Sequence, residues 1–179
     1  IVFATGGYGG KEIKDLKNYW LPIKTFIGVT KPLGNELHSV LKKPLGFSDN
    51  RRAGNYYRVL PGNRLSWGRG ISAVGKFTSL SLKRAISKEI NYFFPELRNV
   101  EIDYVWFGNM AYASHYMPYV GSIKIGNEEK NVFTLMGFGG HGMNTAPGSA
   151  MVLADFMLGK GNNYQVFNKF SRKWNGGLI

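Results

Sequence analysis

The sequence predicts an α+β fold in which a mixed or antiparallel sheet is flanked by helices. Three observations favour this class. Short runs that are rich in β-branched and aromatic residues, or that alternate apolar with polar residues, recur along the 179-residue chain and are typical of strands. Other segments space their apolar residues along one face of a helix. With 44% hydrophobic and 19% charged residues, the chain can also bury a core.

The N-terminal part predicts two strands and a short helix. Residues 1–4 are an apolar run that breaks at a glycine turn, which indicates a buried strand. Residues 11–19 predict a short helix that ends at Pro22, and residues 23–30 predict a strand because they are rich in β-branched and aromatic side chains. Residues 31–55 are polar and contain two prolines, which predicts loop and strand fragments.

A β-hairpin is predicted in the middle of the chain. Residues 56–60 and 64–68 are strand-like and flank a Pro-Gly-Asn turn. Pro61 presets a negative φ at the start of this turn, and Gly62 allows the positive φ that follows.

An amphipathic helix and a further strand come next. The helix is predicted to begin after a cap at Thr78 or Ser79 and to end before Pro95. In the strand, apolar residues alternate with Glu101 and Asp103, which indicates a half-buried position. The apolar positions are Leu82, Ile86, Ile90 and Phe93 in the helix, and Val100, Ile102, Tyr104 and Trp106 in the strand.

The C-terminal part predicts two more strands and a final helix. The strands cover residues 122–125 and 131–136 and are joined by a Gly-Asn-Glu-Glu turn. The helix is expected from about residue 147 to residue 158. Pro147 suits its first turn, and Gly159 suits the position just beyond its end.

Residues 137–142 read Gly-Phe-Gly-Gly-His-Gly and stand between the last strand and the last helix. Glycine at this density indicates main chain that must approach something closely. A strand–glycine loop–helix unit presents N–H groups at the positive end of a helix dipole, which favours a phosphate, a carboxylate or a polarised carbonyl. The spacing matches neither of the usual nucleotide-binding fingerprints. A tight strand-to-helix connection without a ligand explains the same glycines, and this alternative stays open here.

Charge and cysteine content limit the possible functions. Without cysteine, the chain contains no disulfide, thiolate metal site or cysteine nucleophile, and the sequence fits a reducing compartment. The net charge is +12, but the basic residues are scattered, which favours a solvated surface over a nucleic-acid-binding arm. No apolar run reaches the roughly 18 residues of a membrane span. We therefore expect a cytoplasmic protein with no metal, no nucleic-acid partner and no transmembrane segment.

Five segments carry a further signal through their order and spacing. They are IVFATGGYGG, LPIKTFIGVTKPL, YYRVLPGNRLSWGRG, IDYVWFGNMAYASHYMPYVG and NVFTLMGFGGHGMNTAPGSAMVLADFMLG. Together they resemble the FAD-dependent oxidoreductases of the D-amino-acid-oxidase-like family, and within it the branch that contains gamma-glutamylputrescine oxidoreductase. The resemblance covers nearly the whole chain and implies FAD as the cofactor.

The resemblance also implies a domain organisation. Residues 1–10 would be the end of an FAD-binding domain, residues 11–125 a substrate-binding domain, and residues 126–179 a returning strand and helix of the FAD-binding domain. The strand, GxGxxG motif and helix that hold the ADP half of FAD in this family are absent from the sequence. We therefore expect a C-terminal fragment whose partner is the missing N-terminal segment of the same protein.

The resemblance implies that two segments of the chain contact FAD, through main chain that passes close to the flavin ring. His141 could act in acid–base chemistry, but packing beside the flavin or a local hydrogen bond is the favoured interpretation. The expected cofactor-binding residues are Thr5, Gly6, Gly137, Gly139, Gly140, His141, Gly142, Met143 and Asn144.

The implied reaction removes a hydride from the carbon beside an amine, and it requires no dedicated protein base, so no catalytic residue is assigned. The family's substrate-clamping arginine is missing from residues 106–121, which argues for an amine or a larger conjugate as substrate. Arg58 and Arg69 could supply a clamp or be solvated strand charges. The expected substrate residues are Tyr57, Arg58, Trp106, Asn109, Tyr112 and His115, although part of such an aromatic set usually belongs to the core.

Two other functions remain as alternatives at this point. The chain could be a cofactor-free basic binding module that retains the same sheet, or a nucleic-acid binder, which only its charge and aromatic content support. An upstream GxGxxG segment would favour the flavoenzyme over the binding module, and salt-sensitive retention on DNA would favour the nucleic-acid binder.

Overall fold

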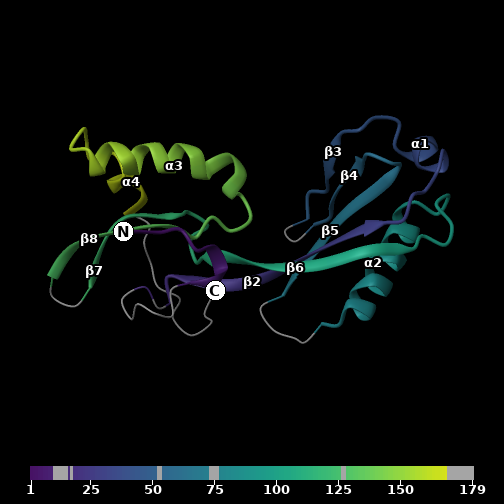
Figure 1. The fold of residues 1–179 in the computed structure, drawn as a ribbon, viewed down its shortest axis with the longest axis horizontal. Helices are drawn as coiled ribbons and strands as arrows, with labels where there is room; N and C mark the ends of the chain where they lie inside the picture. Colours follow the sequence, from purple (N-terminus) through teal and green to yellow (C-terminus); the bar gives the residue numbers. More distant parts are fainter. Residues whose placement is uncertain (10–15, 17, 52–53, 73–76, 126–127, 169–179) are drawn as a thin grey trace. The chain divides into compact units, whose positions relative to one another are not determined.

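The computed structural model describes residues 1–9, 16, 18–51, 54–72, 77–125 and 128–168 (Figure 1). The chain forms two compact units. Unit 1 comprises Ile1–Ile23 and Asn109–Ile179, and unit 2 comprises Lys24–Gly108. These units describe how the chain packs, and the expected division into FAD-binding and substrate-binding domains stays a prediction. The predicted α+β class with mixed and antiparallel sheets is confirmed.

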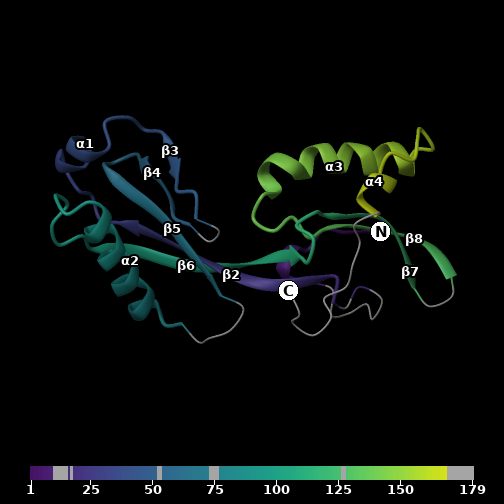
Figure 2. The same ribbon diagram turned by 180° about the vertical axis from the view of Figure 1, so that it is seen from behind.

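Unit 1 contains a three-stranded sheet in the order β1-β8-β7. β1 (Val2–Phe3) is parallel to β8 (Glu128–Met136), which pairs with β7 (Tyr119–Ile125) in antiparallel fashion. The helices α3 (Gly142–Met157) and α4 (Gln165–Asn168) lie on one face of this sheet (Figures 1 and 2). Side chains from both layers form the core beneath α3: Val120, Phe133, Leu153 and Tyr164.

Unit 2 is built on a five-stranded sheet in the order β3-β4-β5-β2-β6. α2 (Ser79–Phe93) packs against one of its faces (Figures 1 and 2), and α1 (Glu36–Val40) is a short helix between β2 and β3. The strands are β2 (Trp20–Thr30), β3 (Gly46–Ser48), β4 (Tyr56–Leu60), β5 (Arg64–Ser72) and β6 (Ile102–Ala113). The core between sheet and helices contains Leu37, Leu41, Val59, Leu65, Trp67, Ile86, Ile90, Leu97, Val100 and Ile102.

Local turn and cap signals predicted several boundaries correctly. β4 and β5 form the expected hairpin with Leu60 opposite Arg64, and Gly62 has a φ of 75°. Thr78 is the N-cap of α2, and its side chain accepts a hydrogen bond from the N–H of Ser81 in a capping box. Gly159, with a φ of 71°, follows the last helical residues as expected.

Other boundaries differ from the prediction. β2 begins at Trp20 and includes the exposed Pro22, which was expected to end a helix. The short helix α1 was predicted as loop, and it is anchored by the fully buried Leu37. β7 and β8 are longer than expected and leave only positions 126–127 between them. Most of the helix predicted for residues 11–19 lies outside the described residues.

Three expected burial patterns are wrong. Ile1 and Val2 are exposed because β1 is an edge strand that pairs only with β8. Phe93 is also exposed, since it ends α2 beyond the buried stripe. In β6, Ile102 is buried and Val105 packs against the same core. Because they are an odd number of residues apart, the alternation of inward and outward side chains shifts between them, and Trp106 is exposed.

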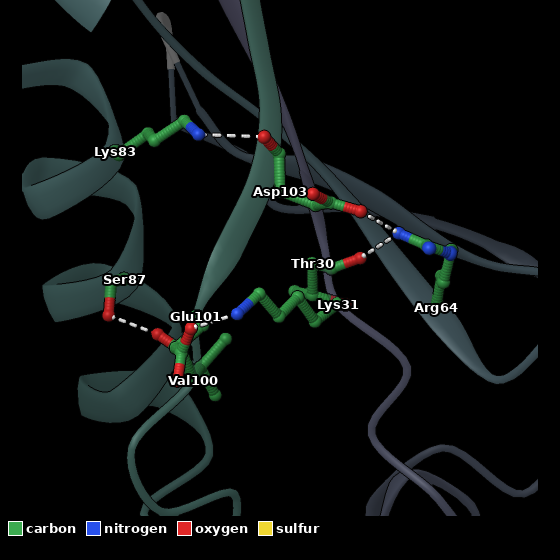
Figure 3. Close-up of polar contacts among 8 residues, drawn as sticks. All are labelled: Thr30, Lys31, Arg64, Lys83, Ser87, Val100, Glu101 and Asp103. Atoms are coloured by element: carbon green, nitrogen blue, oxygen red, sulfur yellow. Dashed lines mark hydrogen bonds and ion pairs between the residues drawn. The ribbon is translucent and has the colours of Figure 1, made fainter. Parts of the chain in front are cut away.

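Polar contacts fix the beginning of β6 to its neighbours, as Figure 3 shows. From α2, Ser87 donates a hydrogen bond to the Val100 carbonyl at 2.6 Å, and Lys83 donates to the Asp103 carbonyl at 2.7 Å. From β5, Arg64 donates to the Asp103 carboxylate at 2.7 Å and to the Thr30 carbonyl at 2.9 Å. These contacts hold β6 in place before it continues from unit 2 into unit 1.

Candidate functional site

The glycine run follows β8 and requires glycine for backbone reasons. Gly137, Gly139 and Gly140 have φ values of 85°, 57° and 88°, which side chains with a Cβ rarely adopt. This conformation turns the chain sharply between Met136 at the end of β8 and Gly142 at the start of α3. The strand–glycine turn–helix arrangement expected from the sequence is therefore present.

The same glycines pack closely on the second half of β6. A Cβ added at Gly139 would lie 3.4 Å from the Tyr112 ring, and one added at Gly140 would lie 3.2 Å from the Met110 sulfur. The Gly139 N–H donates to the Ala111 carbonyl at 2.8 Å, which ties the run to the strand. Close packing against β6 therefore explains part of the need for glycine at these positions.

α3 begins at Gly142, about five residues before the predicted start, so Pro147 lies inside the helix and not in its first turn. The extra turn is supported by Thr145, whose hydroxyl donates to the His141 carbonyl at 2.7 Å and whose N–H donates to the same oxygen at 3.3 Å. Pro147 has no N–H to donate to the Met143 carbonyl, so the helix lacks one hydrogen bond at this position.

The start of α3 is open to solvent. Gly140, His141 and Asn144 are exposed, and the Met143 side chain is 97% exposed. The N–H groups in the first turn of a helix have no acceptor within that helix. In the part of the chain that the structure describes, backbone donors and the positive end of this 16-residue helix therefore face solvent.

His141 makes the local contact that the sequence favoured. Its Nδ1 lies 3.3 Å from the Gly139 carbonyl oxygen, which can only accept, so Nδ1 carries the proton in this pairing. This hydrogen bond links the His141 side chain to the backbone of the same turn.

A second turn, residues 5–9, lies beside this site within unit 1. A Cβ added at Gly7 would lie 2.7 Å from the Asn109 carbonyl, so only glycine allows this contact with β6. The Asn109 N–H donates to the Tyr8 hydroxyl at 3.0 Å. On the other side, the Gly6 N–H donates to the Met136 sulfur at 3.2 Å. The turn is therefore attached to both β6 and the end of β8.

The structure brings the expected cofactor residues together, because Thr5 and Gly6 are joined through Met136 to the glycine run that starts at Gly137. Three expected substrate residues, Asn109, Tyr112 and His115, belong to the same unit. Asn109 contacts the 5–9 turn, and the Tyr112 ring packs on Gly139 and Gly140. Burial raises the pKa of the Tyr112 phenol, which stays protonated at neutral pH.

His115 lies in the turn after β6. Its Nδ1 lies 3.1 Å from the Met117 N–H and accepts a hydrogen bond from it, so the neutral ring carries its proton on Nε2. This orientation directs the remaining donor of His115 away from its own backbone.

The other expected substrate residues lie in unit 2. The Tyr57 ring is stacked on Trp67 at 4.5 Å and packs against the core, so it is a core residue in this unit. Arg58, its neighbour on β4, is exposed and points to the opposite face of the sheet. Trp106 is exposed on β6, and Arg69 is paired with Glu89 at 2.7 Å.

Sequence reasoning missed three residues that shape the site: Tyr8, Met110 and Met136. Tyr8 carries a recognisable signal, since it sits within the glycine-rich segment that resembles the cofactor-contacting turn. Met110 and Met136 have no such signal, because a methionine in a strand usually belongs to the core. Among the described residues, no group of three or more His, Asp or Glu side chains could hold a metal ion. In the same part of the chain, no helix has the length and apolarity needed to cross a membrane.

A family model described as FAD dependent oxidoreductase matches residues 1–156. The chain is 25% identical over 169 residues to gamma-glutamylputrescine oxidoreductase of Escherichia coli, covering 93% of this chain and 38% of that protein. It is 28% identical over 148 residues to a probable oxidoreductase, OrdL, of Haemophilus influenzae, covering 82% of this chain and 32% of that protein. The chain thus spans about a third to two fifths of the length of these relatives.

Solved structures of similar fold include two oxidases. Glycine oxidase from Geobacillus kaustophilus matches with a TM-score of 0.69 at 19% identity, over 98% of this chain and 45% of that one. Fructosyl peptide oxidase from E. terrenum matches with a TM-score of 0.72 at 14% identity, again over 98% and 45% of the two chains. At these identities, the matches establish a shared fold.

Proposed function

Because the chain belongs to the family of FAD-dependent oxidoreductases, we propose that it is the C-terminal part of a flavoenzyme that oxidises the C–N bond of an amine or amino-acid-like substrate. The observation that supports this most is the uncovered start of α3 beside the glycine run. A helix start that was buried under other side chains would leave no room for a flat ring.

The residues present fit FAD. When bound, FAD would accept the hydride, and the reduced ring would carry negative charge. The N–H groups of Gly142, Met143 and Asn144 are suited to stabilise that charge, since they sit at the positive end of α3. Gly140 is exposed on the same segment, whereas Gly137 and Gly139 are buried and shape the turn through their positive φ values. His141, Thr5 and Gly6 complete the proposed cofactor set.

We propose that Asn109, Tyr112 and His115 of unit 1 contact the substrate, whereas Arg58 and Trp106 of unit 2 stay candidates from the sequence alone. Burial raises the pKa of the Tyr112 phenol, so this residue keeps its proton at neutral pH and is a polar group of the proposed substrate region. Tyr57 is a weaker candidate because its ring fills the core. One relative is named for gamma-glutamylputrescine, and structural neighbours are named for glycine and fructosyl peptide, which favours an amine-type substrate.

We further propose that an N-terminal segment of the same protein covers the outer face of α3 and supplies the site for the ADP half of FAD. Large apolar side chains on this helix and just after it are exposed: Met143, Met151, Met157 and Leu158. A row of this kind is typical of a surface that another segment buries. The relatives are more than twice as long as this chain, which leaves room for such a segment. We also propose a cytoplasmic location.

The experiment is to purify the full-length protein and measure its bound flavin, then add polyamines and amino acids one at a time without oxygen. We expect about one FAD per chain and bleaching of the flavin absorbance by at least one amine. A well-folded, colourless protein that takes up no added FAD would contradict the proposal and favour a cofactor-free binding module.

A further inference from the structure

Met136 is the last residue of β8 and is only 1% exposed. It belongs to the core of unit 1, which also contains Leu16, Trp20, Ala111, Ile123 and Val132. By position alone, Met136 is an ordinary core residue. Its sulfur, however, takes part in two polar contacts that a core hydrocarbon could not make.

Both contacts come from the turn at residues 5–9, some 130 positions away in sequence. The Gly6 N–H donates to the Met136 sulfur at 3.2 Å, and the Thr5 hydroxyl lies 3.8 Å from the same atom. Thioether sulfur is a weak acceptor, and backbone N–H groups usually pair with oxygen. The thioether is therefore the partner that satisfies the Gly6 amide on this side of the turn.

The rest of the turn is fixed elsewhere. Gly7 and Tyr8 contact Asn109 of β6, and the Trp20 indole donates to the Gly9 carbonyl at 3.4 Å. These contacts attach the second half of the turn to β6 and β2. The Met136 contacts attach its first half, Thr5 and Gly6, to the end of β8, next to the pairing of Phe3 with Thr134.

Gly6 is also open on its other side. Its φ is 59°, and a Cβ added there would meet no atom within 4 Å. The peptide of Gly6 is thus held from one side by sulfur and faces free space on the other. This is the arrangement expected of main chain that approaches a ligand.

We propose that Met136 is a positioning residue, whose sulfur orients the Thr5–Gly6 peptide so that this turn and the glycine run at residues 137–142 contact the same FAD molecule. The inference rests on the proposed function for its ligand. The contact between sulfur and amide can also be tested without the ligand, so the two ideas can fail separately.

The test is Met136→Leu in the full-length protein. Leucine keeps the apolar bulk and removes the acceptor. We expect a folded protein in which the peptide that contains Gly6 exchanges its amide hydrogens faster. We also expect FAD to bind about fivefold more weakly, which corresponds to the loss of one net hydrogen bond, with an altered visible flavin spectrum. Met117→Leu is the matched control, since Met117 is partly exposed in the turn after β6 and should change neither readout.

Thr5→Val is the second variant, because it removes the hydroxyl donor to the sulfur; since Thr5 also belongs to the proposed cofactor set, amide exchange without FAD is the readout that isolates the sulfur contact. It should change both readouts in the same direction by a smaller amount. If Met136→Leu keeps the wild-type rate of amide hydrogen exchange at Gly6 and the wild-type FAD affinity, the proposal is overturned. If Met136→Leu does not fold, the same two results in Thr5→Val overturn it. If the wild-type protein binds no FAD, the proposed function fails. Unchanged hydrogen exchange at Gly6 in Met136→Leu would then overturn the positioning role on its own.

Discussion

At the residue scale, individual contacts decide which of the expected site residues can meet a ligand. Gly140, His141 and Asn144 are exposed at the start of α3, whereas the Tyr57 ring is stacked on Trp67 in the core of unit 2. Residue type alone could not show that Tyr57 packs inside its unit, because aromatic residues line pockets and cores alike. Burial and neighbouring contacts are what separate them.

Gly142→Val in the full-length protein tests the proposed approach of main chain to the flavin. A Cβ added at this position would lie 3.4 Å from the Phe138 Cβ, which is an ordinary contact, so the fold should tolerate the change. We expect FAD affinity to fall about tenfold or more, because branched carbon would occupy the space of the ring. Flavin titration by fluorescence measures this. Gly46→Val in β3 is the control, since an added Cβ there meets no atom within 4 Å. Normal flavin content in Gly142→Val would count against the assignment.

At the element scale, strands β6 and β8 carry most of the candidate site. β6 brings Asn109, Met110 and Tyr112 to it, and β8 ends at Met136, directly before the glycine run. The predicted end of β8 was correct, whereas the predicted start of α3 was about five residues late. Proline was taken as a marker of the first turn, but hydrogen bonds from Thr145 to His141 extend the helix backwards. Such local reinforcement is hard to read from residue type alone.

Tyr119 on β7 gives this region a pH dependence. Burial, followed by the neighbouring Tyr19 on which it is stacked at 4.6 Å, raises its pKa to about 12. Its pKa in the unfolded chain is about 10, so between these values the folded state keeps a proton that the unfolded state loses. The contribution to stability is therefore complete below about pH 10 and is lost as the pH rises towards 12. After allowance for solvent screening, its size is on the order of 1 kcal/mol.

Tyr119→Phe should therefore lose less stability than wild type when the pH is raised from about 9 to 11. The measurement is the free energy of unfolding by denaturant at each pH, compared as a slope because the variant also lacks the phenol contact with Tyr19. Tyr92→Phe, at an exposed position of α2, should keep the wild-type slope. Equal slopes for all three proteins would refute this source of pH dependence.

At the scale of the whole molecule, membership of the FAD-dependent oxidoreductase family confirms the resemblance found in the sequence. The two compact units each bring candidate residues, with Arg58 and Trp106 in unit 2 and the remaining exposed candidates in unit 1. The proposed ADP-binding segment is not among the five segments that carry the resemblance.

The chain expressed alone is predicted to bind FAD weakly or not at all, because we propose that another segment of the protein supplies the site for the ADP half of FAD. The experiment is gel filtration with excess FAD, followed by the visible spectrum of the protein peak. Stoichiometric yellow flavin on this chain would show the prediction to be wrong. Full-length protein treated in the same way is the control.

The sequence by itself determined features that depend on neighbouring residues: the Pro61–Gly62 turn, the Thr78 cap, most strands, and the ordered segments that reveal the family. Only the tertiary structure decided that Met136 accepts a hydrogen bond from Gly6, that Tyr57 belongs to the core, and that β2 and β6 each pass from one unit to the other. The reason is physical. Turns and caps are set by the torsions and hydrogen bonds of a few adjacent residues, whereas the site depends on contacts between segments up to 130 residues apart, which leave no local pattern.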